Sequence, residues 1–160
     1  MKLIFSAALL ATTLTTQAQT SNTHFSHTLE TTVSPDTIWR IWTDVPNWKQ
    51  WDSGLQSAEL LGPFEQGVQG VLVPNKGPKS RFVIDSIVPH QSYTFRTKLL
   101  LGTLYVKRYL TVQENKTRFT HEVWFTGLTK NLFGKALGKD YRAMLPSVME
   151  KLNSLAKNSE

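Results

Sequence analysis

The sequence predicts an α+β domain in which an antiparallel sheet is covered by one long C-terminal helix. Two observations carry this prediction. Residues 131–157 place apolar side chains, Leu137 among them, at three- and four-residue steps and polar ones such as Asn153 on the other side, which is the pattern of an amphipathic helix. Residues 55–126 instead show short runs of alternating apolar and polar side chains between Gly, Pro and Asn turns, which is the pattern of antiparallel strands. A helix with one wide apolar face needs a surface to cover, and the sheet supplies it.

Length and composition are those of a single globular domain. The chain has 160 residues and no cysteine, which excludes disulfides, thiol catalysis and thiolate metal sites. Its formal net charge is +6, but no run of Lys or Arg is longer than two residues, so we expect no nucleic-acid partner. We expect a monomer without a cofactor or a bound metal.

The first residues have the composition of a secretory signal. Lys2 supplies the positive charge at the start. Leu3–Leu14 is an apolar run that is too short to cross a membrane, and Thr16–Ala18 contains small residues at the two positions that a signal peptidase recognises. We therefore expect residues 1–18 to be removed and the mature protein to be periplasmic or secreted, with one domain over residues 24–157. The alternative is a buried first helix.

The other elements follow in order along the chain. A strand is expected at residues 24–33, and Ser34-Pro35-Asp36 then has the residues of a helix start. That helix ends at Pro46 or is followed there by a second short turn through Trp48 and Trp51. Further strands are expected at residues 57–61, 68–73, 81–88, 93–101, 103–112 and 118–126.

Two polar residues fall on the inward face of the last predicted hairpin. A two-residue turn at residues 115–116 pairs Leu110 with His121 and keeps the apolar rows of both strands on one face. Arg108 and His121 then point inward as diagonal neighbours. Because an unpaired buried charge is costly, we interpret Arg108 as an anchor for an anion or a carbonyl and His121 as a donor or acceptor in the same pocket. The alternative is an arginine that reaches out to solvent and a hydrogen-bonded core histidine.

Tryptophans gather in and after the first predicted helix. Trp39 and Trp42 belong to this cluster, and Trp42 is expected in the core beneath that helix. Trp48 and Trp51 lie in the stretch after Pro46, where aromatic side chains often line the rim of a cavity. Core packing is the alternative for both.

Other chemistries lack their motifs. The four histidines do not have the spacing of a helical zinc site, and neither a G-x-S-x-G elbow nor a Walker sequence is present. The carboxylates are scattered, and no pair is placed for general acid–base catalysis.

The start of the long helix is basic. Lys130, Lys135, Lys139 and Arg142 are placed to make transient contact with an anionic membrane surface while the apolar face covers the sheet. The alternative is an ordinary solvated helix face.

Several segments carry a resemblance to a known family. Residues 34–42 match the first helix of that family, and residues 44–52, which read DVPNWKQWD, match its D-x-x-x-W-x-x-W-D turn. Gly62-Pro63, Thr120-His121 and the long C-terminal helix follow in the same order. The chain resembles the SRPBCC superfamily, the START/Bet v 1-like helix-grip proteins, and is most similar to its polyketide cyclase/dehydrase-like branch.

The resemblance implies a helix-grip fold. A curved antiparallel sheet would wrap around the long C-terminal helix, with two short helices after the first strand. A hydrophobic cavity between sheet and helix would hold a lipid, a sterol or a polyketide-like molecule, with room at its mouth beside Gly134 and Gly138. The family shares no universal catalytic residue, so the resemblance transfers no catalytic position.

These observations favour an exported protein that binds a hydrophobic small molecule and is not an enzyme. One alternative is a cyclase or dehydratase in which His121 moves protons and Arg108 stabilises an enolate. Another is a protein-interaction module without a ligand. The residues expected to contact the ligand are Trp48, Trp51, Phe95, Arg108, His121, Tyr141 and Met144.

Overall fold

The computed structural model describes residues 21–159, so the expected signal segment at residues 1–18 lies outside the described residues. Seven strands and a series of helices confirm the predicted α+β class. The strands are β1 (His24–Thr31), β2 (Leu55–Leu60), β3 (Gln69–Pro74), β4 (Ser80–Val88), β5 (Ser92–Leu99), β6 (Gly102–Gln113) and β7 (Lys116–Gly127).

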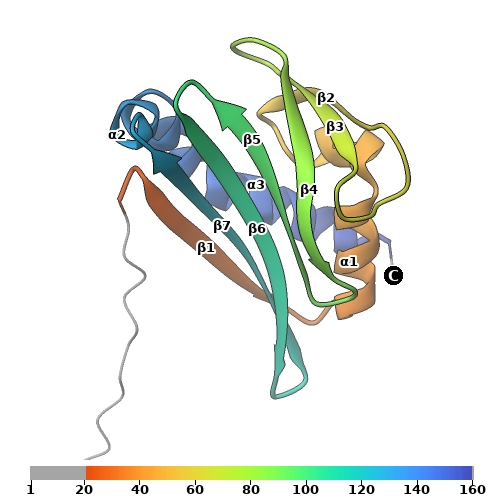
Figure 1. Ribbon diagram of the computed structural model, residues 1–160. Coiled ribbons are helices and arrows are strands. Elements are labelled where there is room, and N and C mark those ends of the chain that lie inside the picture. The colour runs from red at the N-terminus through yellow and green to blue at the C-terminus, as the bar shows by residue number, and fades with distance from the viewer. Residues whose placement is uncertain (1–20, 160) are drawn as a thin grey trace, which may run out of the picture.

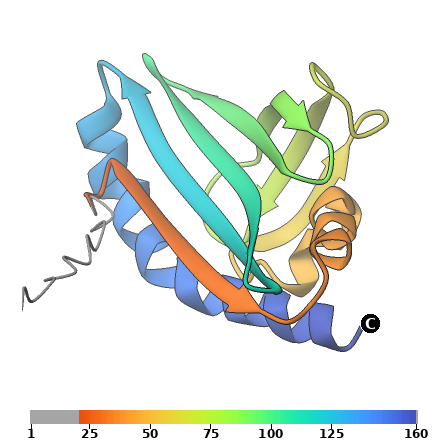
Figure 2. The same cartoon turned by 90° about the horizontal axis from the view of Figure 1, so that it is seen from below.

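All seven strands form one antiparallel sheet in the order β1-β7-β6-β5-β4-β3-β2. The first strand therefore pairs with the last, while every other neighbour in the sheet is also a neighbour in sequence. The sheet curls around a long C-terminal helix (Figure 1). Viewed from below, that helix runs beside β1 across the open side of the sheet (Figure 2). This is the helix-grip arrangement that the resemblance implies.

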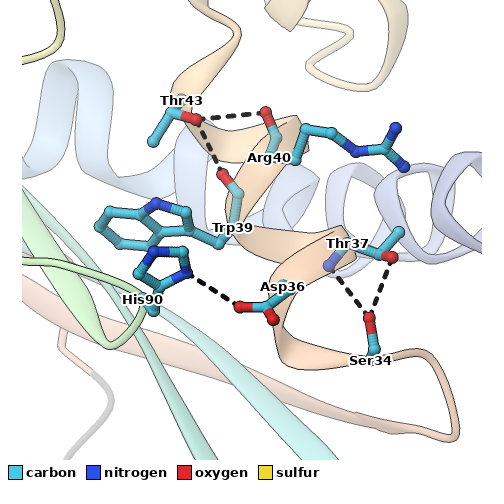
Figure 3. Close-up of polar contacts among 7 residues, drawn as sticks. All are labelled: Ser34, Asp36, Thr37, Trp39, Arg40, Thr43 and His90. Carbon is cyan, nitrogen blue, oxygen red and sulfur yellow. Dashed lines mark hydrogen bonds and ion pairs between the residues drawn. The ribbon is translucent and has the colours of Figure 1, made fainter.

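Two short helices follow β1, as expected. They are α1 (Pro35–Thr43) and the 3₁₀ helix η1 (Val45–Gln50). The Ser34 hydroxyl caps α1 by accepting from the Thr37 backbone N–H at 3.1 Å (Figure 3). His90, in the turn after β4, lies 2.8 Å from the Asp36 carboxylate and stacks on the Trp39 ring. The start of α1 is thereby held against the sheet.

The long helix is continuous but not uniform. A single α-turn, α2 (Lys130–Phe133), leads through the π-helical turn η2 (Gly134–Gly138) into α3 (Lys139–Lys157). A π-turn shifts the residues that follow it around the helix axis. The predicted apolar stripe is therefore wrong in part: Leu137 is exposed, whereas Asn153, expected on the polar side, is buried. No helix of residues 21–159 is long and apolar enough to cross a membrane.

The two early glycines of this helix leave no room for a cavity mouth. A Cβ on Gly138 would lie 2.0 Å from the Asn22 carbonyl oxygen, and one on Gly134 would lie 2.5 Å from the Thr23 side chain. Both glycines instead allow the chain before β1 to pack directly on the helix.

The β6–β7 register differs from the prediction by two residues. The tight turn is at Glu114-Asn115, with φ of 51° and 61°, so Leu110 pairs with Phe119. Arg108 and His121 are consequently directly opposite rather than diagonal. A slip of two leaves every side chain on its predicted face, because the side-chain period of a strand is two.

Candidate functional site

A row of polar and aromatic side chains crosses the inner face of the sheet at Arg108. Its cross-strand partner in β5 is Tyr93 and its partner in β7 is His121, which is in turn paired with His27 of β1. Tyr93, Arg108 and His121 are each only 1% exposed. The alternation of four adjacent strands therefore brings three titratable side chains and one arginine into a single line.

The η1 helix covers this row with indole rings. The Arg108 guanidinium carbon lies 4.4 Å from the centre of the Trp48 ring and 4.6 Å from that of Trp51. The rings of Tyr93 and Phe95 are each 5.6 Å away. These distances are those of cation–π contacts, which strengthen when the cation is removed from water. Ring faces therefore stabilise the positive charge of Arg108.

Hydrogen bonds connect Arg108 to the end of α1. Its guanidinium donates to the Tyr93 hydroxyl, which donates to the Trp42 carbonyl oxygen at 3.4 Å. The Trp48 indole N–H donates to the same carbonyl at 2.9 Å. Burial raises the pKa of Tyr93 to about 12, against the opposing effect of Arg108. Tyr93 therefore remains a neutral hydroxyl that relays between the arginine and the helix end.

Asp52 is the carboxylate of this region. It is 6% exposed, and its oxygen accepts from the Gly54 backbone N–H at 3.0 Å. Burial raises the pKa of Asp52, and the positive charge of Arg108 offsets part of that rise. Within residues 21–159, Arg108 forms no ion pair with any carboxylate. Its charge is balanced at a distance rather than by direct contact.

Several buried nitrogens of this cluster have no hydrogen-bond partner among the described residues. They are Nε of Arg108, both ring nitrogens of His121, and Nε1 of Trp42 and Trp51. Burial, the charge of Arg108 and the nearby His27 hold the pKa of His121 well below its ordinary value, so the imidazole is neutral at neutral pH. Each buried polar group without a hydrogen-bond partner lowers the stability of the fold by about 1–3 kcal/mol. The cluster is therefore rich in N–H donors that lack an acceptor.

The structure places five of the other six expected ligand residues at Arg108 and the sixth, Met144, beside Asp52. Phe95, Trp48, Trp51 and His121 are buried against it. Tyr141 and Met144 approach from α3 and are half-buried. Burial, and then the charge of Asp52, raise the pKa of the Tyr141 hydroxyl, while its hydrogen bond with Arg108 lowers it. Met144 packs over Gly54, beside Asp52.

Two interpretations of these residues change. Trp48 is 0% exposed and lies in the core, whereas Trp51 is 1% exposed, lies in the core and also lines a hollow beside α1 and η1. Arg108 does not reach out to solvent, and His121 is not a hydrogen-bonded core histidine within the described part of the chain. Trp42 lies in the core as expected.

Two hollows on the described residues lie outside the space between the sheet and α3. One, of about 160 Å³, lies between α1, η1 and the end of α3. The other, of about 200 Å³, lies beside Thr31, Lys116 and Lys157. Trp51 both lines the first hollow and contacts Arg108. Buried side chains of the sheet, of η1 and of α3 form one core where the resemblance implies a cavity, among them Phe95, Trp48 and Met149.

Sequence reasoning missed Asp52, Tyr93 and His27 as members of the cluster. Tyr93 and His27 each had a signal, because strand alternation places them on the same face as Arg108 and His121. No strand alternation in the sequence indicated that Asp52 would join the cluster. It ends the tryptophan turn, and only the packing of η1 against the sheet brings it to Arg108.

The sequence matches the model of the polyketide cyclase/dehydrase and lipid transport family over residues 22–159. The chain belongs to this family, as the resemblance indicated. A search of curated proteins finds no match to the sequence.

Several solved structures are similar to this chain. A hypothetical protein from Helicobacter pylori has a TM-score of 0.71 at 8% identity, over 91% of this chain and 99% of its own. The protein Ara h 8.0201 has a TM-score of 0.66 at 12% identity, over 84% and 97%. Truncated norcoclaurine synthase from Thalictrum flavum has a TM-score of 0.62 at 12% identity, over 82% and 91%. At these identities the likeness shows the fold alone.

Proposed function

We propose that this protein binds a hydrophobic small molecule that carries an oxygen-bearing polar group, and that Arg108 anchors that group. The observation that carries the proposal is the completely buried guanidinium, which has no carboxylate partner among the described residues and an unused Nε. A carboxylate, phenolate or carbonyl oxygen would accept from Arg108 and from the unpartnered N–H groups around it.

The apolar body of the ligand would lie among the aromatic residues that now fill the interior. Binding then requires α3 to separate from η1 and the sheet, so that the ligand replaces contacts between protein side chains. Tyr141 and Met144 are half-buried on α3, and both contact the Arg108 region. They are the side chains that would move first, and Trp51 would be uncovered toward the hollow beside η1.

Paired ligands test the anchor. We expect a long-chain fatty acid to quench tryptophan fluorescence with at least tenfold higher affinity than the alcohol of equal length, because a hydrogen bond to a charged group contributes about 1.5–3 kcal/mol. Arg108→Leu should abolish this preference. Arg81→Leu, on an exposed arginine of β4, should preserve it. Equal affinities for acid and alcohol in both the parent and Arg108→Leu would exclude Arg108 as an anchor.

Native mass spectrometry after gentle purification separates the broader alternatives. A co-purified small molecule supports the binding protein. A chain that carries no small molecule and binds neither probe supports the interaction module with a filled core.

A second candidate function is a cyclase or dehydratase. The supporting observation is that His121 is neutral, has both ring nitrogens unpartnered and lies directly opposite Arg108. A neutral imidazole can accept a proton from carbon while the guanidinium stabilises the enolate oxygen. If a poly-β-ketone substrate is turned over, His121→Ala should abolish the turnover, and turnover that survives in this variant excludes the mechanism.

We also propose that the protein is exported. The support is the sequence of residues 1–18, with its basic start, apolar run and small residues at the end. The test is the intact mass of the protein recovered from the periplasmic or culture fraction. An N-terminus near Gln19 is the expected result, and a full-length chain confined to the cytoplasm would contradict it.

A further inference from the structure

Four leucines are exposed at one end of the molecule, far from any role in the core. Leu128 is 89% exposed, Leu100 73%, Leu101 64% and Leu132 63%. Single exposed leucines are ordinary, but a group of neighbouring ones indicates a contact surface. These four residues are called the leucine patch below.

The leucine patch is one surface because two turns are fastened together. The Leu128 backbone N–H donates to the Leu101 carbonyl at 3.0 Å, and the Thr129 hydroxyl donates to the Leu100 carbonyl at 2.5 Å. These bonds join the β5–β6 turn to the segment between β7 and α2. Figure 1 shows α2 and the β5–β6 turn at the same end of the molecule. Leu132 is carried on α2 itself.

Local structure does not explain the leucine at the tip. Leu101 has φ of 53°, in the left-handed region where Gly and Asn are favoured and leucine is uncommon. Its side chain is mostly in water, so no core packing compensates for the backbone cost. A large apolar residue kept at a strained, exposed position points to a contact made outside the folded chain.

The surroundings of the leucine patch are basic. Lys98, Lys130, Lys135 and Lys139 are exposed, and none has an ion-pair partner within residues 21–159. The sequence has no carboxylate between Asp85 and Glu114 or between Glu122 and Asp140, so both leucine-bearing segments lack negative charge. Arg142 interacts with another part of the protein, so the basic surroundings of the leucine patch consist of the four lysines.

We propose that the leucine patch docks on a membrane surface that contains anionic lipid. The leucines would enter the boundary between headgroups and acyl chains, and the lysines would contact lipid phosphates. The charge argues against a second copy of the chain, because a symmetric contact through this patch would bring its lysines against one another. Docking would place the start of α3, with Tyr141 and Met144, next to the source of an apolar ligand.

Vesicle co-sedimentation tests the proposal with the purified protein. The vesicles are phosphatidylcholine alone and an equal mixture of phosphatidylcholine and phosphatidylglycerol. We expect binding to the mixed vesicles that falls with added salt, and weak binding to phosphatidylcholine alone. Each lysine near an anionic surface is worth about a fivefold change in partitioning, so Lys130→Glu/Lys135→Glu/Lys139→Glu should lose on the order of a hundredfold or more.

The leucines are tested separately, in a variant that keeps every charge. Leu128→Ser/Leu132→Ser should lower partitioning on the order of tenfold per leucine, since each buries an apolar side chain in lipid. Both positions are exposed, so folding should be preserved, and circular dichroism checks this. The matched controls lie at the other end of the sheet and on other elements: Leu61→Ser/Val112→Ser and Lys49→Glu/Lys151→Glu should bind as the parent does.

Three outcomes would overturn the proposal. Equal loss in the control variants would show a diffuse effect of charge or hydrophobicity. No binding to either vesicle would exclude docking. A dimer in light scattering that dissociates in Leu128→Ser/Leu132→Ser would assign the leucine patch to a second copy. The test is independent of Arg108, because Arg108→Leu should dock as the parent does even if it binds no fatty acid.

Discussion

Arg108 lies against the face of Trp48, with 4.4 Å between the guanidinium carbon and the ring centre, and both residues are almost completely buried. An arginine in the middle of a sheet, held by ring faces and without a carboxylate at contact distance, is an expensive element of a core. Groups with a strongly shifted pKa, such as the neighbouring His121, cluster at functional sites. Variants of this cluster separate its contribution to the fold from its contribution to binding.

Arg108→Leu should leave the free energy of unfolding unchanged within about 1 kcal/mol, or raise it. Replacing a buried charge with an apolar residue removes its desolvation cost, which offsets the lost ring contacts. Arg108→Lys should instead cost about 2 kcal/mol, because it keeps the charge but loses the planar group that lies between the rings. Urea denaturation measures both variants. A loss of 3 kcal/mol or more in Arg108→Leu would show that the arginine serves the fold.

His121 should make the protein less stable as the pH falls below about 6.5, the ordinary histidine value. The pKa of His121 is lowered in the folded state. Below about pH 6.5 the imidazole is therefore protonated in the unfolded chain but still neutral in the folded protein. The contribution of His121 to the free energy of unfolding is fully present above pH 6.5. Below that pH it falls by about 1.4 kcal/mol per pH unit, until the pKa of the folded state is reached.

The measurement is the free energy of unfolding as a function of pH for the parent and for His121→Gln. The difference between the two curves isolates His121 from the other histidines. The pKa of Asp52 is raised in the folded protein, so this carboxyl group favours folding as the pH falls, and it does so in both curves. Parallel curves would contradict a buried neutral imidazole.

Gly138→Ala should destabilise the protein by about 2 kcal/mol or more. In an ordinary helix this change is worth about 1 kcal/mol of stabilisation. Here the new Cβ would meet the Asn22 carbonyl oxygen at 2.0 Å, and that backbone cannot move without disturbing the start of β1. Thermal denaturation compares it with Ala136→Gly, an exposed position two residues earlier, which should cost only about 1 kcal/mol. A stabilised Gly138→Ala would show that residues 22–23 do not pack on the helix.

Leu101→Asn should raise the free energy of unfolding by about 1 kcal/mol, because asparagine tolerates the left-handed backbone that leucine resists. The same change should weaken binding to anionic vesicles. A substitution that raises the free energy of unfolding but lowers the affinity for vesicles indicates a residue that serves binding rather than folding. Lower stability would mean that the Leu101 side chain packs within the domain.

Periodicity in the sequence was enough to predict the class of fold, the order of its elements and the faces of its strands. The alternation of β6 and β7 placed Arg108 and His121 inside the sheet, because the inward face depends only on whether a position is odd or even. The family resemblance added the curvature of the sheet and decided for a second short helix after the first.

Tertiary structure decided the rest. Alternation cannot distinguish registers that differ by two residues, so the Glu114-Asn115 turn determined that Arg108 and His121 are directly opposite. The π-turn rotated Leu137 outward, a change that a regular helical repeat cannot predict. Asp52, Trp48 and Trp51 reach Arg108 only because η1 packs on the sheet, a contact between segments more than fifty residues apart. Such contacts depend on how layers meet in three dimensions, and local patterns in the sequence do not record them.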